Sequence, residues 1–333
     1  MNIRVVLIGL GPIGAAVGRQ LVSRRGFQVV GAVDIDPYKV GKDAGDVIEA
    51  GRKLRVKVGD SIGKTIRGSK PDAAVLCTSS QLKAVIPQFE EVLKYKVPIV
   101  TTTEEAAYPA SYNRRLAKRL DEAARKAKVA VLGTGVNPGF TMDALPIMLS
   151  AVCERVDRVE VWRVQDARVR RLPFQQKIGA GLTPEQFQKK VEDGTVRHVG
   201  FAESIHMIAD AMGWRLDRVV DDVAPQIAET AVASDLLAVD PGYVAGVIQT
   251  GSGYVGGEEK IRLRLEAYLG APQSYESVLI EGSPRIYSKV EGGIHGDIAT
   301  ASMTVNSIPA AITAEPGFRT MRDVRLPSFF PGR

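Results

Sequence analysis

Two neighbouring carboxylates follow an apolar run in the stretch VPIVTTTEEAAYP, and they are the first residues whose positions suggest chemistry. Thr102 and Glu105 fit the S/T-x-x-E pattern of a capping box, in which the glutamate bonds the backbone N–H of the cap residue. That pattern predicts a structural role for Glu105 and leaves Glu104 to face a ligand. A carboxylate enclosed at a strand end has its pKa raised by desolvation, which suits proton transfer near neutral pH. Spacing alone leaves open both a catalytic Glu104 and a purely structural pair.

A glycine-rich turn near the N-terminus predicts a dinucleotide site. GLGPIG matches G-x-G-x-x-G, follows an apolar strand and opens a helical pattern, and Asp34 comes 20 residues after its last glycine. The glycines of such a motif permit a tight turn and close backbone approach to a pyrophosphate, and the later acid binds the adenosine ribose. Asp34 favours NAD, whereas Lys39 and Lys42 leave NADP open, because a lysine there can pair with a 2′-phosphate. The predicted cofactor residues are Gly9, Leu10, Gly11, Pro12, Ile13, Gly14, Asp34, Asp36, Lys39, Thr78, Ser79 and Asn137.

Polar residues at two further strand ends belong to this predicted site. Thr78 and Ser79 follow the apolar run AAVLC, where their hydroxyls would meet the phosphate or ribose side of the cofactor. Further along, VLGTGVNPGF places Asn137 just before Pro138. A structural interpretation makes Asn137 the cap of the next helix, with Pro138 in its first turn. A functional interpretation places its amide at the reactive end of the cofactor, with Phe140 forming a wall for the substrate.

The composition indicates a globular enzyme with small-molecule partners. The chain has 333 residues, of which 45% are apolar and 25% charged, and its net charge of +6 is spread along its length. Cys77 and Cys153 offer neither a disulfide framework nor metal-ligand spacing. The start, MNIRVVLIGLG, runs directly into the glycine motif and lacks the features of a signal or membrane segment. We therefore expect a cytoplasmic enzyme with no metal and no nucleic-acid or membrane partner.

The elements that would position these residues alternate regularly through the first part of the chain. Apolar β-rich runs cover 3–9, 27–34, 73–79, 97–103 and 129–135, and helical spacing of apolar residues covers 12–24, 81–94 and 111–126. Near-continuous apolar strands joined by helices predict a parallel sheet covered on both faces, which is the α/β class and a doubly wound Rossmann domain. Ligands of such sheets bind beyond the carboxyl ends of the strands, where the glutamates, the glycine turn and Asn137 all fall.

The pattern changes after residue 150. Residues 155–166 alternate apolar and polar side chains, helical stretches follow at 183–192 and 201–213, and 260–270, 276–282 and 283–290 have the pattern of antiparallel strands. This predicts a C-terminal α+β domain with a mixed or antiparallel sheet. The expected boundaries are 1–140 for the NAD(P)-binding Rossmann domain, 141–296 for a substrate and dimerisation domain, and 297–333 for a closing helix, capped by Asp297, and a tail that packs back on the Rossmann domain.

Seven motifs spread over nearly the whole chain carry a family resemblance. They are GLGPIG, VDIDPYKVGKD, TTTEEAAYP, LGTGVNPGF with MDALP, RRLPFQQKIGAG, HVGFAESIHMIA and GGIHGDIATASMTVNSIP. Together they resemble the 2,4-diaminopentanoate dehydrogenase family, which includes the native amine dehydrogenases. The resemblance implies a fold similar to that of dihydrodipicolinate reductase and a homodimer. It also implies reversible NAD- or NADP-dependent deamination of an amine to a ketone and ammonia, with ammonium as a partner.

The same resemblance implies roles for individual residues. A pocket glutamate of the family holds ammonium and moves protons, and motif position assigns this role to Glu104, with Glu105 as the alternative. Arg163 would pair with the carboxylate of a diamino acid, whereas phenylalanines would line the pocket for a simple alkyl amine, and the sequence leaves both open. His295 also fits a purely structural role before Asp297. The pocket walls implied by motif position are Phe140, Arg163, Phe174, His198 and His295.

Two other functions remain as alternatives. One is a different imine- or carbonyl-reducing oxidoreductase on the same scaffold, and the other is a non-catalytic NAD(P)-binding regulator. The chain has no His-His pair of the kind found in dihydrodipicolinate reductase itself. It also has Thr-Glu-Glu where the related sugar dehydrogenases have Glu-Lys-Pro, so a catalytic lysine is missing from that position. Dihydrodipicolinate reductase activity and sugar dehydrogenase activity are therefore both disfavoured.

Overall fold

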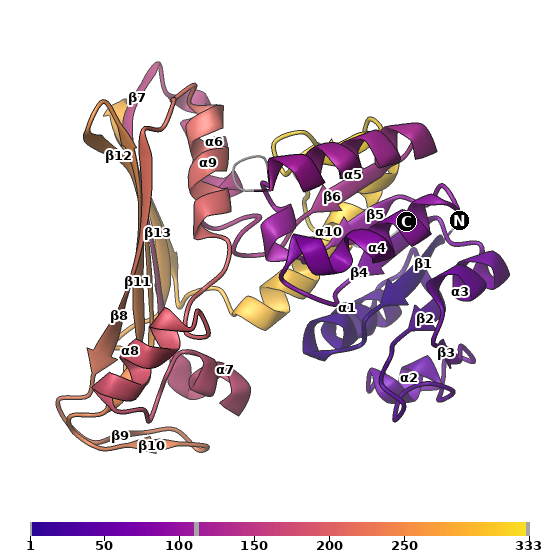
Figure 1. Ribbon diagram of the computed structural model, residues 1–333, viewed down its shortest axis with the longest axis horizontal. Helices are drawn as coiled ribbons and strands as arrows, with labels where there is room; N and C mark the ends of the chain where they lie inside the picture. The colour runs from indigo at the N-terminus through magenta and orange to yellow at the C-terminus, as the bar shows by residue number, and fades with distance from the viewer. Residues whose placement is uncertain (1, 110–112, 331–333) are drawn as a thin grey trace. The chain divides into compact units, whose positions relative to one another are not determined.

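The computed structural model describes residues 2–109 and 113–330. It divides into two compact units, and the chain crosses between them at 140/141 and again at 294/295. The first unit contains residues 1–140 together with 295–333, and the second contains residues 141–294. The helix and strand that follow residue 294 therefore belong to the same unit as the N-terminal strands, although the whole second unit lies between them in the sequence (Figure 1).

The first unit is built on a seven-stranded parallel sheet with the order β15-β6-β5-β4-β1-β2-β3. The central strands are short apolar runs that are almost wholly buried, which is why they pair as a parallel sheet with both faces covered. The strands are β1 (Ile3–Ile8), β2 (Phe27–Val33), β3 (Val58–Gly59), β4 (Ala73–Leu76), β5 (Ile99–Thr101), β6 (Ala130–Gly133) and β15 (Gly317–Arg319).

Helices cover both faces of this sheet (Figure 1). On one face lie α3 (Ile62–Ser69), α4 (Leu82–Leu93) and α5 (Arg114–Ala127), whose apolar sides form a core with the central strands. On the other face α1 (Pro12–Ser23) packs along α10 (Gly296–Thr313). The short α2 (Ala44–Val47) and the 3-10 helix η1 (Glu104–Ala106) lie in the connections. This arrangement confirms the doubly wound fold and brings the carboxyl ends of β1, β2, β4, β5 and β6 to one edge.

The second unit is built on a six-stranded mixed sheet with the order β14-β13-β7-β12-β11-β8. β7 runs parallel to β12, and the remaining neighbours are antiparallel. The strands are β7 (Arg155–Asp166), β8 (Arg218–Ile227), β11 (Val244–Val255), β12 (Glu258–Tyr268), β13 (Tyr275–Ser283) and β14 (Ile286–Glu291), with a separate hairpin of β9 (Val232–Ala233) and β10 (Ala238–Val239). The expected mixed sheet is therefore confirmed.

Only one face of this second sheet carries helices in the part of the chain that the structure describes (Figure 1). Phe201 and Ile205 of α9 (Phe201–Ala211) pack against β11 and β12, and Gly251 and Gly253 of β11 leave room for them. The other helices of this unit are α6 (Ala144–Leu149), α7 (Leu172–Lys177) and α8 (Pro184–Glu192), with the 3-10 turns η2 (Ser150–Val152) and η3 (Ala167–Val169). The apolar positions of β7, β12 and β13 face these helices and form the core.

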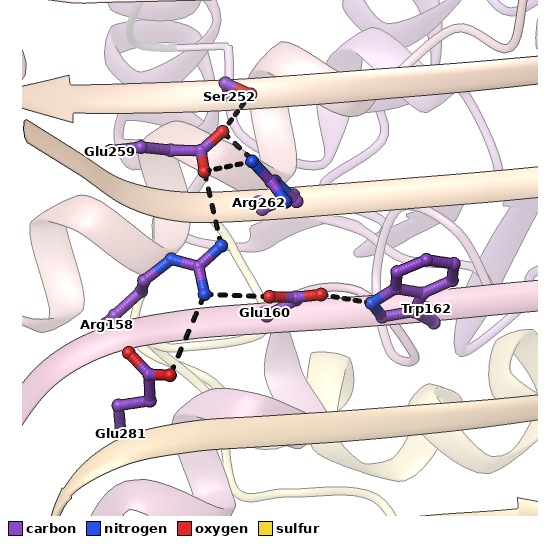
Figure 2. Close-up of polar contacts among 7 residues, drawn as sticks. All are labelled: Arg158, Glu160, Trp162, Ser252, Glu259, Arg262 and Glu281. Carbon is purple, nitrogen blue, oxygen red and sulfur yellow. Dashed lines mark hydrogen bonds and ion pairs between the residues drawn. The ribbon is translucent and has the colours of Figure 1, made fainter.

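The opposite face of the second sheet, which we call the outer face, carries a network of ion pairs (Figure 2). Arg158 lies 2.8 Å from Glu160, 3.2 Å from Glu259 and 3.9 Å from Glu281, so one guanidinium joins three strands. Glu259 also accepts from Ser252 and pairs with Arg262 at 2.7 Å, and the indole N–H of Trp162 donates to Glu160. The charges of this face are therefore largely paired within the face itself.

Several expected details are corrected by the structure. The sequence pattern did not reveal the edge strands β3 and β15 or the long strands β8 and β11. The predicted start of the helix at 111 lies outside the described residues, and α5 is described from Arg114. Asp297 is not the cap of α10, because His295 holds that position and its carbonyl accepts the Ala299 N–H at 2.9 Å, which leaves Asp297 in the first turn.

Candidate active site

The glycine-rich turn joins β1 to α1 and leaves a surface that a ligand can approach. Gly9 has a φ of +87°, and a Cβ on Gly14 would lie 1.9 Å from the carbonyl oxygen of Gly9, so both positions require glycine. Gly11 is different, because a Cβ there would meet no atom of the described chain within 4 Å. Gly11 also caps α1 without a side-chain acceptor, and Pro12 follows in the first turn. Open space at an uncapped helix N-terminus fits a pyrophosphate.

Asp34 follows β2 directly and is bound on three sides. Its Oδ2 accepts the Leu10 N–H at 2.8 Å, its Oδ1 accepts the Asp36 N–H at 2.9 Å, and the Lys39 ammonium lies 3.1 Å from Oδ2. Burial opposes ionisation, yet the two N–H groups and Lys39 keep the pKa of Asp34 below its ordinary value. A carboxylate held beside the glycine turn fits the ribose hydroxyls of a dinucleotide.

The hydroxyls of Thr78 and Ser79 have local partners. Thr78 donates to Gln88 at 2.8 Å, and Ser79 accepts the Gln81 N–H at 3.2 Å at the start of α4. The methyl group of Thr78 nevertheless stands next to Gly9, since a Cβ on Gly9 would lie 2.7 Å from it. These residues therefore lie at the predicted place beside the turn, and binding a cofactor through Thr78 Oγ1 would require its bond to Gln88 to be exchanged.

The two glutamates after β5 have different surroundings. Glu105 accepts the Leu82 N–H at 2.8 Å and an amide hydrogen of Asn113 at 3.3 Å, so it caps α4 and not its own turn. The expected capping box with Thr102 is therefore wrong, because a neighbouring helix N-terminus offers unpaired N–H groups to the same carboxylate. Glu104 is half-buried, and its carboxylate has no hydrogen-bond partner within residues 2–109 and 113–330, whereas its backbone carbonyl accepts the Ala107 N–H at 3.0 Å.

The position of Glu104 relative to the cofactor edge follows from Cys77. Cys77 directly follows β4 and lies beside the glycine turn, where a Cβ on Gly14 would lie 3.6 Å from the Cys77 Cβ. Burial, together with a smaller contribution from the negative charge of Glu104, raises the pKa of Cys77 to about 11. The carboxylate of Glu104 is thus close enough to Cys77, just after β4, for its charge to affect the thiol. Cys77 itself stays protonated at neutral pH, as expected of a packed small side chain.

Asn137 is one of several buried polar residues that have side-chain atoms without a hydrogen-bond partner in the described chain. Its side chain is 7% exposed, and neither its amide nitrogen nor its oxygen has a hydrogen-bond partner in the described chain. Asn137 is not a helix cap, because α6 begins at Ala144 and Asp143 caps it with a bond to the Ala144 N–H. The hydroxyl of Thr134 is likewise buried and unpartnered among the described residues. Buried groups of this kind are rare unless a ligand completes them.

Arg163 lies on the helix-covered face of the second sheet and is 3% exposed. Its guanidinium donates to Thr141 Oγ1 at 3.1 Å and to the Ile294 carbonyl at 2.9 Å, and its Nε lies 3.5 Å from Glu276. Burial lowers the pKa of Arg163 to about 10, and burial raises the pKa of Glu276 while Arg163 opposes that rise. Arg163 thus binds the first and the last residue of the second unit, a role that sequence motifs alone did not suggest.

His198 lies among cations and is neutral at physiological pH. Its Nδ1 is 2.7 Å from the Val199 carbonyl, which can only accept, so Nδ1 carries the hydrogen and Nε2 is an acceptor. Burial lowers the pKa of His198 to about 3, and the charges of Lys177, Arg163 and Arg170 contribute. Phe174 joins this group, because the Arg170 guanidinium stacks 3.9 Å over its ring. Three of the expected pocket residues, Arg163, Phe174 and His198, therefore lie in one region of the second unit.

The remaining expected pocket residues, Phe140 and His295, belong to the first unit and flank the two chain crossings. The sequence reasoning did not single out Thr134, Lys177 and Glu276, since nothing in their spacing distinguishes them from ordinary polar residues. No cluster of three potential metal ligands occurs in the described part of the chain. Within the same residues, every helix is too short or too polar to cross a bilayer.

The Rossmann sheet, the open glycine turn and the carboxylate of Asp34 beside it are the features of a nicotinamide-dependent dehydrogenase. Residues 140–332 match the family model of the 2,4-diaminopentanoate dehydrogenase C-terminal domain. The whole chain is 34% identical to 2,4-diaminopentanoate dehydrogenase of Acetoanaerobium sticklandii, covering 99% of this chain and 96% of that protein. The chain therefore belongs to the 2,4-diaminopentanoate dehydrogenase family, as the sequence motifs indicated.

Two amine dehydrogenases extend the comparison. The amine dehydrogenase of Streptomyces virginiae is 23% identical over 97% of this chain and 96% of its own length. The solved structure of the amine dehydrogenase of Mycobacterium smegmatis superposes with a TM-score of 0.86 at 24% identity and covers 100% of this chain and 99% of that one. The structural likeness extends over both units and supports the fold described above.

Proposed function

We propose that this protein is an amine dehydrogenase that uses Glu104 to hold the reacting nitrogen and to move its protons. The observation that carries the proposal is the contrast between two adjacent carboxylates at one strand end. The carboxylate of Glu105 is bound to the start of α4. The carboxylate of Glu104 has no hydrogen-bond partner in the described chain, and its charge acts on Cys77 beside the glycine turn. A carboxylate without an internal partner is available to an ammonium group.

The net reaction converts an ammonium-bearing carbon, oxidised cofactor and water into a ketone, ammonium, reduced cofactor and one proton. A bound nicotinamide supplies or accepts the hydride. In the oxidative direction Glu104 takes a proton from the substrate ammonium, which frees the nitrogen lone pair that forms the iminium double bond. After that proton has passed to solvent, Glu104 takes a proton from the water that attacks the iminium carbon and gives it to the nitrogen, which leaves as ammonia. The hydroxyl group then loses its proton to form the ketone, and this proton converts ammonia into ammonium. In the reductive direction the same carboxylate holds ammonium for the ketone.

The preferred cofactor under this proposal is NAD. Asp34 offers its carboxylate to ribose hydroxyls, whereas a 2′-phosphate would bring a second negative group against it. The loop after β2 also exposes two large apolar side chains, Ile35 and Tyr38. Exposed apolar groups beside a ribose-binding acid suit the faces of an adenine ring.

The substrate under this proposal is an amino acid that carries a second amine. Arg163, Arg170 and Lys177 all act on His198, and Glu276 is the carboxylate that faces Arg163. Three cations and one carboxylate leave a positive region, which stabilises a carboxylate and repels a bare alkylammonium ion. Because Arg163 is already bound to Thr141, Ile294 and Glu276, we expect it to act on the substrate through its charge.

A cofactor-reduction screen tests this function. Purified protein is incubated with NAD or NADP and either 2,4-diaminopentanoate or short alkyl amines, and then in reverse with 2-amino-4-oxopentanoate or short ketones, with and without ammonium. We expect turnover of the diamino acid, and reverse turnover only with ammonium present. Turnover of alkyl amines alone would overturn the substrate class. Ammonium-independent reduction would indicate a carbonyl reductase, and cofactor binding without any turnover would indicate a regulator.

Replacing Asn137 with alanine should separate its two possible roles. Because its amide makes no hydrogen bond within the described chain, Asn137→Ala should lower the free energy of unfolding by less than about 1 kcal/mol. If the amide completes its bonds with the cofactor, the Kd for NADH should rise about fivefold to tenfold. NADH fluorescence titration measures the change in Kd, and urea unfolding measures the change in the free energy of unfolding. Thr134→Val is the matched variant, and an unchanged Kd in Asn137→Ala would remove Asn137 from the cofactor site.

We also propose that the outer face of the second sheet pairs with the same face of a second copy. Its charges are already paired internally, it carries Trp162, Tyr275 and Tyr287, and no described helix covers it. Self-paired charges and aromatic side chains suit a symmetric interface, because two identical faces then meet without like-charge repulsion.

Leu279 at a half-buried position of this outer face tests the pairing. Leu279→Arg should convert a dimer into a monomer in sedimentation velocity, since it places two like charges at a two-fold contact. Val152→Arg, at an exposed apolar residue in the turn before β7, is the control and should stay dimeric. An unchanged sedimentation coefficient for Leu279→Arg would rule out this face.

A further inference from the structure

We propose that Asp36 determines which nicotinamide cofactor the protein accepts, by holding the Lys39 ammonium away from a 2′-phosphate. Lys39 is the residue whose type suits NADP, whereas Asp34 suits NAD, so the contacts between them decide what the loop can bind. The inference rests on the dinucleotide site of the proposed function and is independent of the amine chemistry.

The geometry places one cation between two carboxylates. Lys39 Nζ lies 3.1 Å from Asp34 Oδ2 and 3.6 Å from Asp36 Oδ2. The side chains of Asp34, Lys39 and Asp36 are 9%, 27% and 36% exposed, so the pair with Asp34 is the more enclosed of the two. A backbone hydrogen bond holds residues 36 and 39 together, because the Lys39 N–H donates to the Asp36 carbonyl at 2.9 Å. Lys39 is therefore tied to residue 36 through both its main chain and its side chain.

The charge of this group disfavours a 2′-phosphate. Two carboxylates and one ammonium sum to one negative charge, and a 2′-phosphate would bring about two more. To meet that phosphate, Lys39 would have to leave both carboxylates, which would then repel the ligand at close range. A 2′-hydroxyl has no such conflict, since it donates to Asp34 while Lys39 remains in place. Lys39 thus supports the ribose-binding form of Asp34 and is not available as a phosphate ligand.

Asp36 is the member of the group that can be changed without dismantling the site. Asp34 cannot, because it also accepts the Leu10 N–H of the glycine turn. Asp36 uses Oδ1 to accept the Tyr38 N–H at 2.9 Å and turns Oδ2 toward Lys39. In Asp36→Asn the amide oxygen keeps the bond to Tyr38, and the amide nitrogen, a donor, faces the ammonium. The turn is retained, and Lys39 loses one of its two carboxylate partners and is held by Asp34 alone.

A double-mutant cycle on cofactor binding tests the inference with the full-length protein. NADH and NADPH are titrated by fluorescence into wild type, Asp36→Asn, Lys39→Met and the double variant, and 2′,5′-ADP and 5′-AMP serve as competitors that lack the nicotinamide. We expect Asp36→Asn to lower the ratio of the NADPH Kd to the NADH Kd about tenfold, with the NADH Kd unchanged within about twofold. We expect Lys39→Met to remove most of that gain.

The cycle separates a released lysine from a simple loss of negative charge. If the gain of Asp36→Asn persists in the Lys39→Met background, charge removal alone explains it and the inference is wrong. If Asp36→Asn leaves the ratio unchanged, Asp36 does not hold Lys39 in the way proposed. Lys42→Met, at an exposed lysine three residues further on, is the control and should leave the coupling intact. These readouts measure binding alone, so they stand or fall apart from any amine turnover.

Discussion

Glu104→Gln should lower kcat for deamination by about 10² to 10⁴ and leave the NADH Kd unchanged. The amide keeps the size and the hydrogen-bonding atoms of the side chain but cannot take a proton from an ammonium group or from water. The loss should therefore appear in kcat more than in cofactor binding. Steady-state kinetics on the diamino acid and NADH titration of the same preparation check the two statements together.

Glu105→Gln is the matched control, one residue further along the same turn. Its amide oxygen can still accept the Leu82 N–H, so we expect near-normal turnover with a modest loss of stability at the start of α4. Full activity in Glu104→Gln together with a loss in folded Glu105→Gln would transfer the catalytic role to Glu105. Loss of NADH binding in Glu104→Gln would instead make Glu104 a cofactor residue.

Arg163→Met should destabilise the second unit by about 3 to 5 kcal/mol. The variant keeps much of the side-chain volume but leaves Glu276 buried without its cation and leaves the Ile294 carbonyl with one donor fewer. Both tryptophans of the chain, Trp162 and Trp214, belong to this unit, so their fluorescence in urea reports on it directly. The Arg163→Met/Glu276→Gln double variant should recover part of the loss, because neither charge of this buried pair then remains.

The pH dependence of that variant gives an independent check. Burial raises the pKa of Glu276 in the folded protein, and removing Arg163 should raise it further. When a carboxyl group has a higher pKa in the folded than in the unfolded protein, the protein loses stability as the pH rises from the unfolded pKa through the folded pKa. The reason is that the folded protein disfavours the charged form of the group. The stability difference between Arg163→Met and wild type should therefore be smaller at about pH 5 than at about pH 8. An equal difference at both values would mean that Glu276 does not carry the cost.

The first unit could largely be predicted because its signals are local. The strands are continuous apolar runs, the glycine pattern requires particular backbone geometry at Gly9 and Gly14, and Asp34 falls at a fixed distance from both. The edge strands β3 and β15 escaped prediction because two or three residues carry no periodicity, and only the neighbours β2 and β6 make them strands. β8 and β11 were missed because glycines and mixed polar residues interrupt their alternation.

The sequence by itself determined the family, the doubly wound sheet and the group of residues at its carboxyl edge, because periodicity and glycine spacing depend only on nearby residues. Tertiary structure alone decided which of these residues are available. It bound Glu105 to a helix 23 residues earlier, left Asn137 without an internal partner, and bound Arg163 to residues 22 positions before it and 131 positions after it. Hydrogen-bond partners of this kind are distant in sequence, and no local pattern encodes which donor reaches a given carboxylate or amide first.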